Sequence, residues 1–224
     1  MEVKYIILII IAFLNLLLGG FIFFRSQKSP INVSFSIFLG GAFLWTLGLV
    51  FFMTSLNVEI AAYWSRVYYF AAAIIVLAFL MFANYYLYSY HKLTEVRISY
   101  FFIPFVIITF VIFHPTLLIG EVTHYDWGND ANENLLGHLM FAFYFFTYLI
   151  ISYYILFKKL KRSDGMHRVS LKIIIWSTLV SYVFGIIFDL ILPIAGEYRF
   201  VWVGPVFTVV TIFFLSYYLF IKSR

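Results

Sequence analysis

The stretch that decides the fold is residues 61–88, AAYWSRVYYFAAAIIVLAFLMFANYYLY. Its centre, Ala71–Phe82, contains only apolar side chains, and Arg66 is the single charged residue of the whole stretch. About 20 mostly apolar residues are enough for a helix to cross the roughly 30 Å of bilayer hydrocarbon. Backbone polar groups in hydrocarbon must be satisfied within their own segment, so this stretch predicts a transmembrane helix.

Six further apolar runs of spanning length occur along the chain. They lack the period-two alternation that marks a membrane β-barrel. We therefore predict an all-α integral membrane protein, a seven-transmembrane-helix bundle that forms a single domain over residues 1–224. The predicted helices cover residues 3–24, 33–54, 61–88, 98–118, 135–157, 169–195 and 201–221.

The composition of the 224-residue chain supports this class. Hydrophobic residues make up 64% and charged residues 11%, whereas a soluble domain carries about 45–50% apolar and about 25% charged residues. The values therefore exclude a soluble domain and a disordered chain. The chain has no cysteine, which excludes disulfides, thiolate nucleophiles and cysteine-ligated metal centres.

The net charge of +5 is distributed unevenly between the two sides of the predicted bundle. Twelve of the 15 Lys and Arg residues fall after the first, third and fifth helices and at the carboxy terminus. The positive-inside rule then places the N-terminus outside and the C-terminus in the cytoplasm, in the plasma (cytoplasmic) membrane. The basic excess is a sign of topology, and we expect no nucleic-acid partner.

The longest outer connection is residues 119–134, IGEVTHYDWGNDANEN. Gly120, Gly128 and the polar turn residues favour a small hairpin over the outer face. Metal-capable side chains occur in and just after it, at His124, Asp126, Asp130, Glu133 and His138. Their spacing matches neither the H-E-x-x-H motif nor the EF-hand loop, so we expect an acidic solvated loop and no bound metal.

Two ionisable residues stand out inside the predicted helices, where a charge is costly and usually has a function. Arg66 lies about six residues from the outer end of its helix, and Asp189 lies about six residues before its helix leaves on the same side; at 1.5 Å per residue both are roughly 9–10 Å deep. We predict an Arg66–Asp189 ion pair, which serves either signal reception or only as a clamp between two helices.

Further polar and aromatic side chains are expected in the same layer. His138 lies near the outer end of its helix, and Trp64 and Tyr69 flank Arg66 along the third helix. Together with Arg66 and Asp189, they are the candidate residues for ligand binding or signal sensing in a cavity open to the outside. The alternative is that the aromatic residues belong to the interfacial belt of a membrane protein.

Catalytic motifs are absent from the predicted spans: there is no G-x-S-x-G, no P-loop and no paired catalytic carboxylates. A retinal Schiff base requires a lysine midway along the seventh helix, and residues 200–221 contain none. We therefore predict no enzymatic activity and no cofactor for these residues.

Short motifs occur near the starts of the second and third helices and near the end of the chain: SPIN (29–32), WTLG (45–48), WSR (64–66) followed by two tyrosines, DLILP (189–193), YR (198–199) and GP (204–205). Together they resemble the N-terminal seven-transmembrane-helix region of bacterial sensor histidine kinases. The resemblance spans nearly the whole chain. Asp189 stands where that family usually has Asn, so the charge at this position differs.

The resemblance implies a membrane-embedded sensory or signal-input domain. In the family, the seventh helix continues into a cytoplasmic helix and then into the phosphoacceptor and ATP-binding domains. Arg224 falls where that continuation would begin, so we expect either part of a longer kinase or a freestanding form. The expected partners are the lipid bilayer, a cytoplasmic kinase or output domain in cis or in trans, and a second copy in a homodimer.

A small-solute transporter or channel is the alternative function. It requires a polar path through the midplane of the membrane, and the apolar centre Ala71–Phe82 argues against such a path. A scaffold that binds a cytoplasmic partner without any ligand is a third interpretation.

Overall fold

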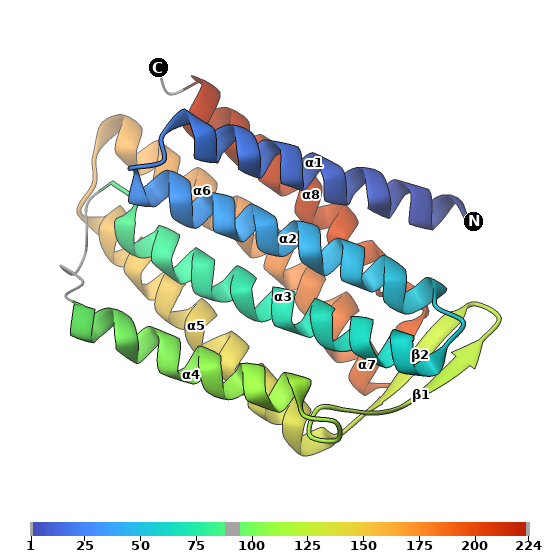
Figure 1. Ribbon diagram of the computed structural model, residues 1–224. Coiled ribbons are helices and arrows are strands. Elements are labelled where there is room, and N and C mark those ends of the chain that lie inside the picture. Colours follow the sequence, from blue (N-terminus) through green and yellow to red (C-terminus); the bar gives the residue numbers. More distant parts are fainter. Residues whose placement is uncertain (1, 88–94, 223–224) are drawn as a thin grey trace.

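The computed structural model describes residues 2–87 and 95–222, and helices form most of them (Figure 1). In chain order the elements are α1 (Val3–Arg25), α2 (Pro30–Thr54), α3 (Val58–Tyr85), α4 (Glu95–Phe113), β1 (Ile119–Tyr125), β2 (Gly128–Glu133), α5 (Leu135–Lys161), α6 (Gly165–Ile186), the π-helical turn η1 (Ile187–Ile191), α7 (Leu192–Ile194), the 3-10 turn η2 (Tyr198–Phe200), α8 (Val203–Ser216) and the π-helical end η3 (Tyr217–Lys222).

Polar caps set where several of these helices begin. Ser29, Asn57 and Asn134 each precede a helix, and each side chain accepts a backbone N–H from the first turn. Such caps satisfy donors that have no partner inside the helix. Pro30 occupies the first turn of α2, where its missing N–H costs nothing.

Six helical rods in the described ranges are long and apolar enough to cross a membrane: α1, α2, α3, α5, α6 with η1, and η2 with α8. α4 adds a shorter apolar helix, with Tyr100–Phe113 as its apolar part. The structure therefore contains helices at all seven predicted runs, together with one short β-hairpin.

Several helix ends differ from the predicted ones. α4 ends at Phe113 and not at residue 118, because Pro115 disfavours helical backbone at the residue before it. α5 continues to Lys161 and not only to residue 157, since lysine is a good helix former. Residue 88, the predicted end of the third helix, lies outside the described residues, as does Lys92 of the basic connection.

The helices α1, α2, α3, α5, α6 and α8 pack in a closed ring, in that order, and α8 returns to contact α1. α3 is the most deeply buried span, and α4 packs outside the ring against α3 and α5. Close approach of α2 to α3 depends on Gly41, where an added Cβ would lie 2.9 Å from Ile75. In this ring, the adjacent helices α2 and α3 (the α2–α3 wall) face the adjacent helices α6 and α8 (the α6–α8 pair) across the interior.

The strands β1 and β2 form an antiparallel hairpin over one end of the bundle (Figure 1). Asn129 is fully buried, and its side-chain amide donates to the carbonyls of Phe52 and Ser55 at 2.5 and 2.7 Å. These carbonyls belong to the end of α2, so the contact caps that helix. Gly128, with φ +136°, lets the hairpin approach Met53, where an added Cβ would lie 2.8 Å from Cε.

The two ends of the bundle differ in charge. The end covered by β1 and β2, here called the hairpin end, also holds the start of α1. The opposite end, here called the basic end, holds the α1–α2 and α5–α6 connections and the carboxy-terminal end of α8 (Figure 1). Arg25, Lys28, Lys161 and Arg162 lie at the basic end. The two ends of the described chain therefore lie at opposite ends of the bundle.

Candidate functional site

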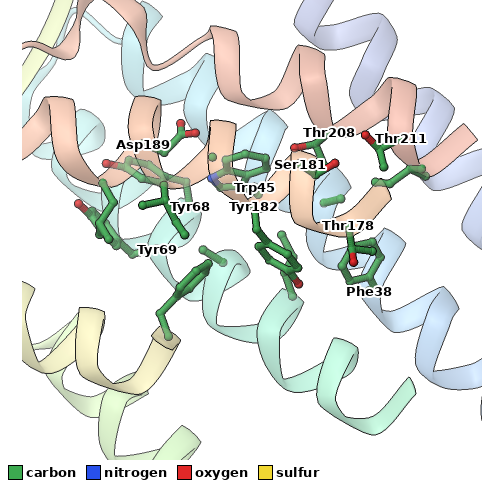
Figure 2. A pocket seen from close by; sticks show the side chains of 18 of the residues that line it. Phe38, Trp45, Tyr68, Tyr69, Thr178, Ser181, Tyr182, Asp189, Thr208 and Thr211 are labelled. Carbon is green, nitrogen blue, oxygen red and sulfur yellow. The ribbon is translucent and has the colours of Figure 1, made fainter. Parts of the chain in front are cut away.

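The ring of helices surrounds a partly open cavity of about 80 Å³ (Figure 2). Its lining comes from α2, α3 and α5 on one side and from α6, η1 and α8 on the other. Asp189 and Tyr69 lie toward one end of the view in Figure 2, and Phe38 and Thr178 lie toward the other. An engineered cavity of about 150 Å³ holds benzene, so this one suits a compact molecule.

Three polar atoms at this cavity have no hydrogen-bond partner among the described residues. They are the Oδ2 of Asp189, the Oγ of Ser181 and the hydroxyl of Tyr182, and all three are buried. Buried polar groups in folded proteins are nearly always paired, so each exception requires an explanation. One acceptor and two hydroxyls, spread over about 12 Å of a single helical rod, are thus unpaired within an otherwise apolar interior.

The threonine hydroxyls of the cavity lining, in contrast, have hydrogen-bond partners. Thr178 donates to the carbonyl of Ile174 at 2.7 Å, and Thr211 donates to the carbonyl of Phe207 at 3.1 Å. Ser and Thr commonly return such a hydrogen bond to their own helix. The capacity to bind a ligand is therefore concentrated on Asp189, Ser181 and Tyr182.

A break in the regular helix positions Asp189. Pro193 lacks an N–H, and its ring clashes with the carbonyl four residues earlier, which belongs to Asp189. The backbone responds by widening into the π-helical turn η1 over Ile187–Ile191, so Asp189 lies in an irregular turn. Single π-helical turns inside α-helices occur frequently at functional sites.

The opposite wall of the cavity is aromatic. Tyr68 and Tyr69 of α3 stack with ring centroids 4.7 Å apart, and Phe141 of α5 meets Tyr69 edge to face at 4.9 Å. Trp45 of α2 completes this side of the lining. The geometry presents ring faces and edges to whatever occupies the cavity.

A second cavity, of about 450 Å³, lies beneath the hairpin. Thr123, Asp130 and Asn132 of the hairpin line it, as does His138 of α5. His138 is 1% exposed and meets the Tyr69 ring edge to face, with centroids 6.1 Å apart. Because Tyr69 lines the inner cavity and His138 lines the outer one, this ring pair lies between the two spaces.

The predicted Arg66–Asp189 ion pair is wrong. Arg66 donates to the carbonyl of Pro115 at 2.9 Å and to that of Ile119 at 3.5 Å, so it joins α3 to the segment that follows α4. Asp189 makes no ion pair with any described residue, and Arg66 is absent from the lining of the cavity to which Asp189 belongs. Arg66 and Asp189 are predicted at the same depth in the membrane, but equal depth does not bring two side chains together.

The other candidate residues are divided between several places. Asp189 and Tyr69 line the inner cavity, and His138 lines the outer one. Trp64 lies at neither, and its ring packs against Phe51 of α2 with centroids 4.5 Å apart. The structure thus brings Asp189, Tyr69 and His138 to one region and leaves Arg66 and Trp64 outside it.

The metal-capable residues of the hairpin do not converge among the described side chains, which exclude that of Glu133. No group of three or more His, Asp or Glu side chains suited to a metal ion occurs in this part of the chain. The Nδ1 of His124 instead makes a hydrogen bond with the Oδ1 of Asn129, at 2.8 Å.

Sequence reasoning missed Ser181 and Tyr182. An uncharged hydroxyl within an apolar run does not indicate a functional site, since it usually donates a hydrogen bond to a carbonyl of its own helix. A weak signal does exist, because Tyr182, Gly185, Ile186 and Asp189 recur at the spacing of one helix face.

Comparison with known proteins identifies the class of this membrane bundle. A family model described as the N-terminal 7TM region of histidine kinase matches residues 7–221. The prediction of a multi-pass membrane protein of this type is confirmed. No curated protein matches the chain.

Proposed function

The chain belongs to the family of N-terminal seven-transmembrane (7TM) regions of histidine kinases, and from this premise we propose that its inner cavity receives the stimulus. The 7TM region of a histidine kinase is a sensory domain and not the catalytic part. It lies in a bilayer and works with a cytoplasmic kinase module.

The observation that carries the proposal is the position of the cavity. It separates the α2–α3 wall from the α6–α8 pair, and both sides contribute to its lining. An occupant that fits one spacing of these helices better than another shifts the population toward that spacing. Helix shifts of about 1–2 Å are sufficient for a signalling change.

α8 is the proposed output element. It contributes Thr208 and Thr211 to the cavity, and its carboxy-terminal end lies at the basic end of the bundle. The positive-inside rule places a basic end in the cytoplasm. A displacement of α8 would therefore be delivered on the side where a kinase module works.

The orientation in the membrane belongs to the same proposal, with the hairpin end outside and the basic end in the cytoplasm. The chain has no cysteine, so a single introduced cysteine is a unique label. Asp126→Cys on the hairpin should react with a membrane-impermeant maleimide added to intact cells, and Arg162→Cys should react only after lysis. The reverse pattern would overturn the orientation.

Filling the cavity tests its role in signalling. Gly185 lines the cavity, and an added Cβ there meets nothing within 4 Å. Gly185→Leu should lock the output of a kinase module joined after Arg224, measured as autophosphorylation in membranes. Gly20→Leu is the matched control, since Gly20 is also helical with open space at its Cβ but does not line the cavity. Output that is identical in both variants and the parent protein would overturn the proposal.

Spin labels give a direct measurement of the relay. Lys28→Cys in the α1–α2 connection and Tyr217→Cys at the end of α8 provide a unique pair, and Tyr217 is exposed. Gly185→Leu should shift the distance between the labels, whereas Gly20→Leu should not.

Specific counterflow of a solute in proteoliposomes, with no effect on kinase output, would instead support the transporter alternative.

A further inference from the structure

The inner cavity contains an acidic side chain without a positive partner. Asp189 makes no ion pair with any described residue, and the cavity lining includes no Lys, Arg or His. A carboxylate removed from water without a counter-charge is strongly disfavoured in a membrane interior. A positive charge brought by the occupant would remove this cost.

The remainder of the lining fits the same kind of occupant. Trp45, Tyr68 and Tyr69 contribute aromatic rings to the cavity. The faces of such rings attract cations, and aromatic cages around quaternary ammonium groups are the familiar use of this attraction. A neutral apolar occupant would gain from the rings but would leave the Oδ2 of Asp189 without a hydrogen-bond partner.

Hydrogen-bonding capacity is also available farther along the same cavity, about 10–12 Å along the rod from Asp189. The Oγ of Ser181 and the hydroxyl of Tyr182 are buried and have no partner among the described residues. Both come from the helical rod that carries Asp189. They can pair with a hydroxyl or an N–H of a molecule that occupies that part of the cavity.

We propose that the inner cavity binds a compact organic cation, an alkylammonium or quaternary ammonium group, with Asp189 as the counter-charge and the aromatic rings as a cage. This inference rests on the proposed function, because it names the class of ligand for the same cavity. The volume of about 80 Å³ favours a compact ligand over a bulky ring system, and because the cavity is partly open the ligand need not be wholly enclosed.

Matched probes test the charge. Choline and tetramethylammonium are the cations, and 3,3-dimethylbutan-1-ol is the uncharged analogue of choline. The purified chain is titrated with each by calorimetry in maltoside micelles, which contain no amine. We expect the cations to bind at least tenfold more tightly than the alcohol. Equal binding of choline and the alcohol, or no binding by either cation, would overturn the proposal.

Two variants locate the site. Asp189→Asn keeps the shape of the side chain and should weaken choline binding at least tenfold, whereas Asp126→Asn on the exposed hairpin should leave it unchanged. Gly185→Leu keeps the carboxylate and fills the cavity, so it should abolish binding even if Asp189→Asn does not fold. Unchanged choline binding in folded Asp189→Asn or in Gly185→Leu would contradict the assignment.

The ammonium group could come from a free solute or from a lipid headgroup, and a second arm distinguishes these sources. Choline binding is compared in nanodiscs of phosphatidylglycerol with and without phosphatidylethanolamine. Weaker binding when phosphatidylethanolamine is present identifies a lipid headgroup as a competitor, and unchanged binding identifies a free solute.

The two proposals fail separately. Choline binding without any change in kinase output would overturn the signalling role of the cavity and leave the ligand class standing. A change in output on Gly185→Leu without cation binding by the parent protein would overturn the ligand class and leave the signalling role of the cavity standing.

Discussion

Asp189 and Gly204 lie in direct contact, and the carboxylate of Asp189 fills the space that a side chain at position 204 would need. A Cβ built on Gly204 would collide with Oδ2 and would lie 2.9 Å from Cγ of Asp189. The contact joins η1 to the first turn of α8. The acidic residue of the inner cavity therefore also sets how closely the two helices of the α6–α8 pair approach each other.

Gly204→Ala should force the carboxylate of Asp189 out of its position. Overpacking of a buried contact typically costs about 1–3 kcal/mol, and we expect destabilisation in this range. The free energy of unfolding, measured by titration with sodium dodecyl sulfate in mixed micelles, provides the test.

Making Gly204→Ala in a protein that lacks the Asp189 carboxylate tests whether that carboxylate causes the loss of stability. With Asp189→Ala already in place, the carboxylate is gone, so Gly204→Ala should have little effect. An equal cost in both backgrounds would show that the contact with Asp189 is not what requires glycine at this position.

Arg66 and Asp189 should behave as independent residues. Arg66 binds carbonyls of Pro115 and Ile119, whereas Asp189 lies at the inner cavity. Residues that share no partner are usually additive within about 0.3–0.5 kcal/mol. A double-mutant cycle with Arg66→Gln and Asp189→Asn, read as unfolding free energy, should therefore give no significant interaction term. A coupling above about 1 kcal/mol would contradict the separation of the two sites.

The same pair shows what the sequence does and does not determine. The apolar runs predict where the chain crosses the membrane because hydrocarbon thickness sets their length, and counting residues along a run gives the depth of Arg66 and Asp189. The face of each helix that meets a neighbour depends on how all the helices pack. That rotation turns Arg66 toward the α4–β1 connection, and no local pattern reveals it.

The site was harder to predict than the fold for a related reason. A cavity is a gap left by the packing of side chains from several helices, so no single stretch encodes it. Asp189 stands out in the sequence because a charge in a membrane is rare, whereas Ser181 and Tyr182 carry no such signal. The hairpin followed from its glycines and polar turn residues, but its docking through Asn129 depends on the distant end of α2.

A pH-dependent contact is expected between Glu197, in the loop after α7, and Arg199 of η2. Arg199 donates to both carboxylate oxygens of Glu197, at 2.7 and 3.0 Å, and these hydrogen bonds lower the pKa of Glu197 below its ordinary value. Because this pKa is depressed in the folded state, the contact is present above the ordinary carboxyl pKa of about 4.3 and is lost as the pH falls through the folded value.

Arg199→Gln should return the pKa of Glu197 toward that of a free carboxyl, measured by carboxyl carbon NMR titration. Both side chains are substantially exposed, at 56% for Arg199 and 40% for Glu197. Added salt should therefore raise the pKa of Glu197 in the parent protein and have less effect in the variant. A Glu197 pKa that is the same in both proteins would contradict the contact.

Lys159 should contribute more to stability than any other lysine of its connection that the structure describes, because its side chain turns inward. It is fully buried, and its Nζ donates to the carbonyls of Ala83, Asn84 and Tyr86 at 2.9, 2.7 and 2.7 Å. These carbonyls close the carboxy-terminal end of α3, where a helix has acceptors but no donors of its own. A positive charge also complements the dipole at this end.

Lys159→Met keeps much of the length of the side chain and removes its donors. Leaving buried acceptors unpaired costs about 1–3 kcal/mol for each group, so a loss of at least about 2 kcal/mol in unfolding free energy is expected. Lys161→Met is the matched control, because Lys161 is exposed in the same last turn of α5, and it should change stability by less than about 1 kcal/mol. Faster hydrogen exchange at the end of α3 in Lys159→Met alone would tie the loss to this cap, whereas equal stability of the two variants would refute it.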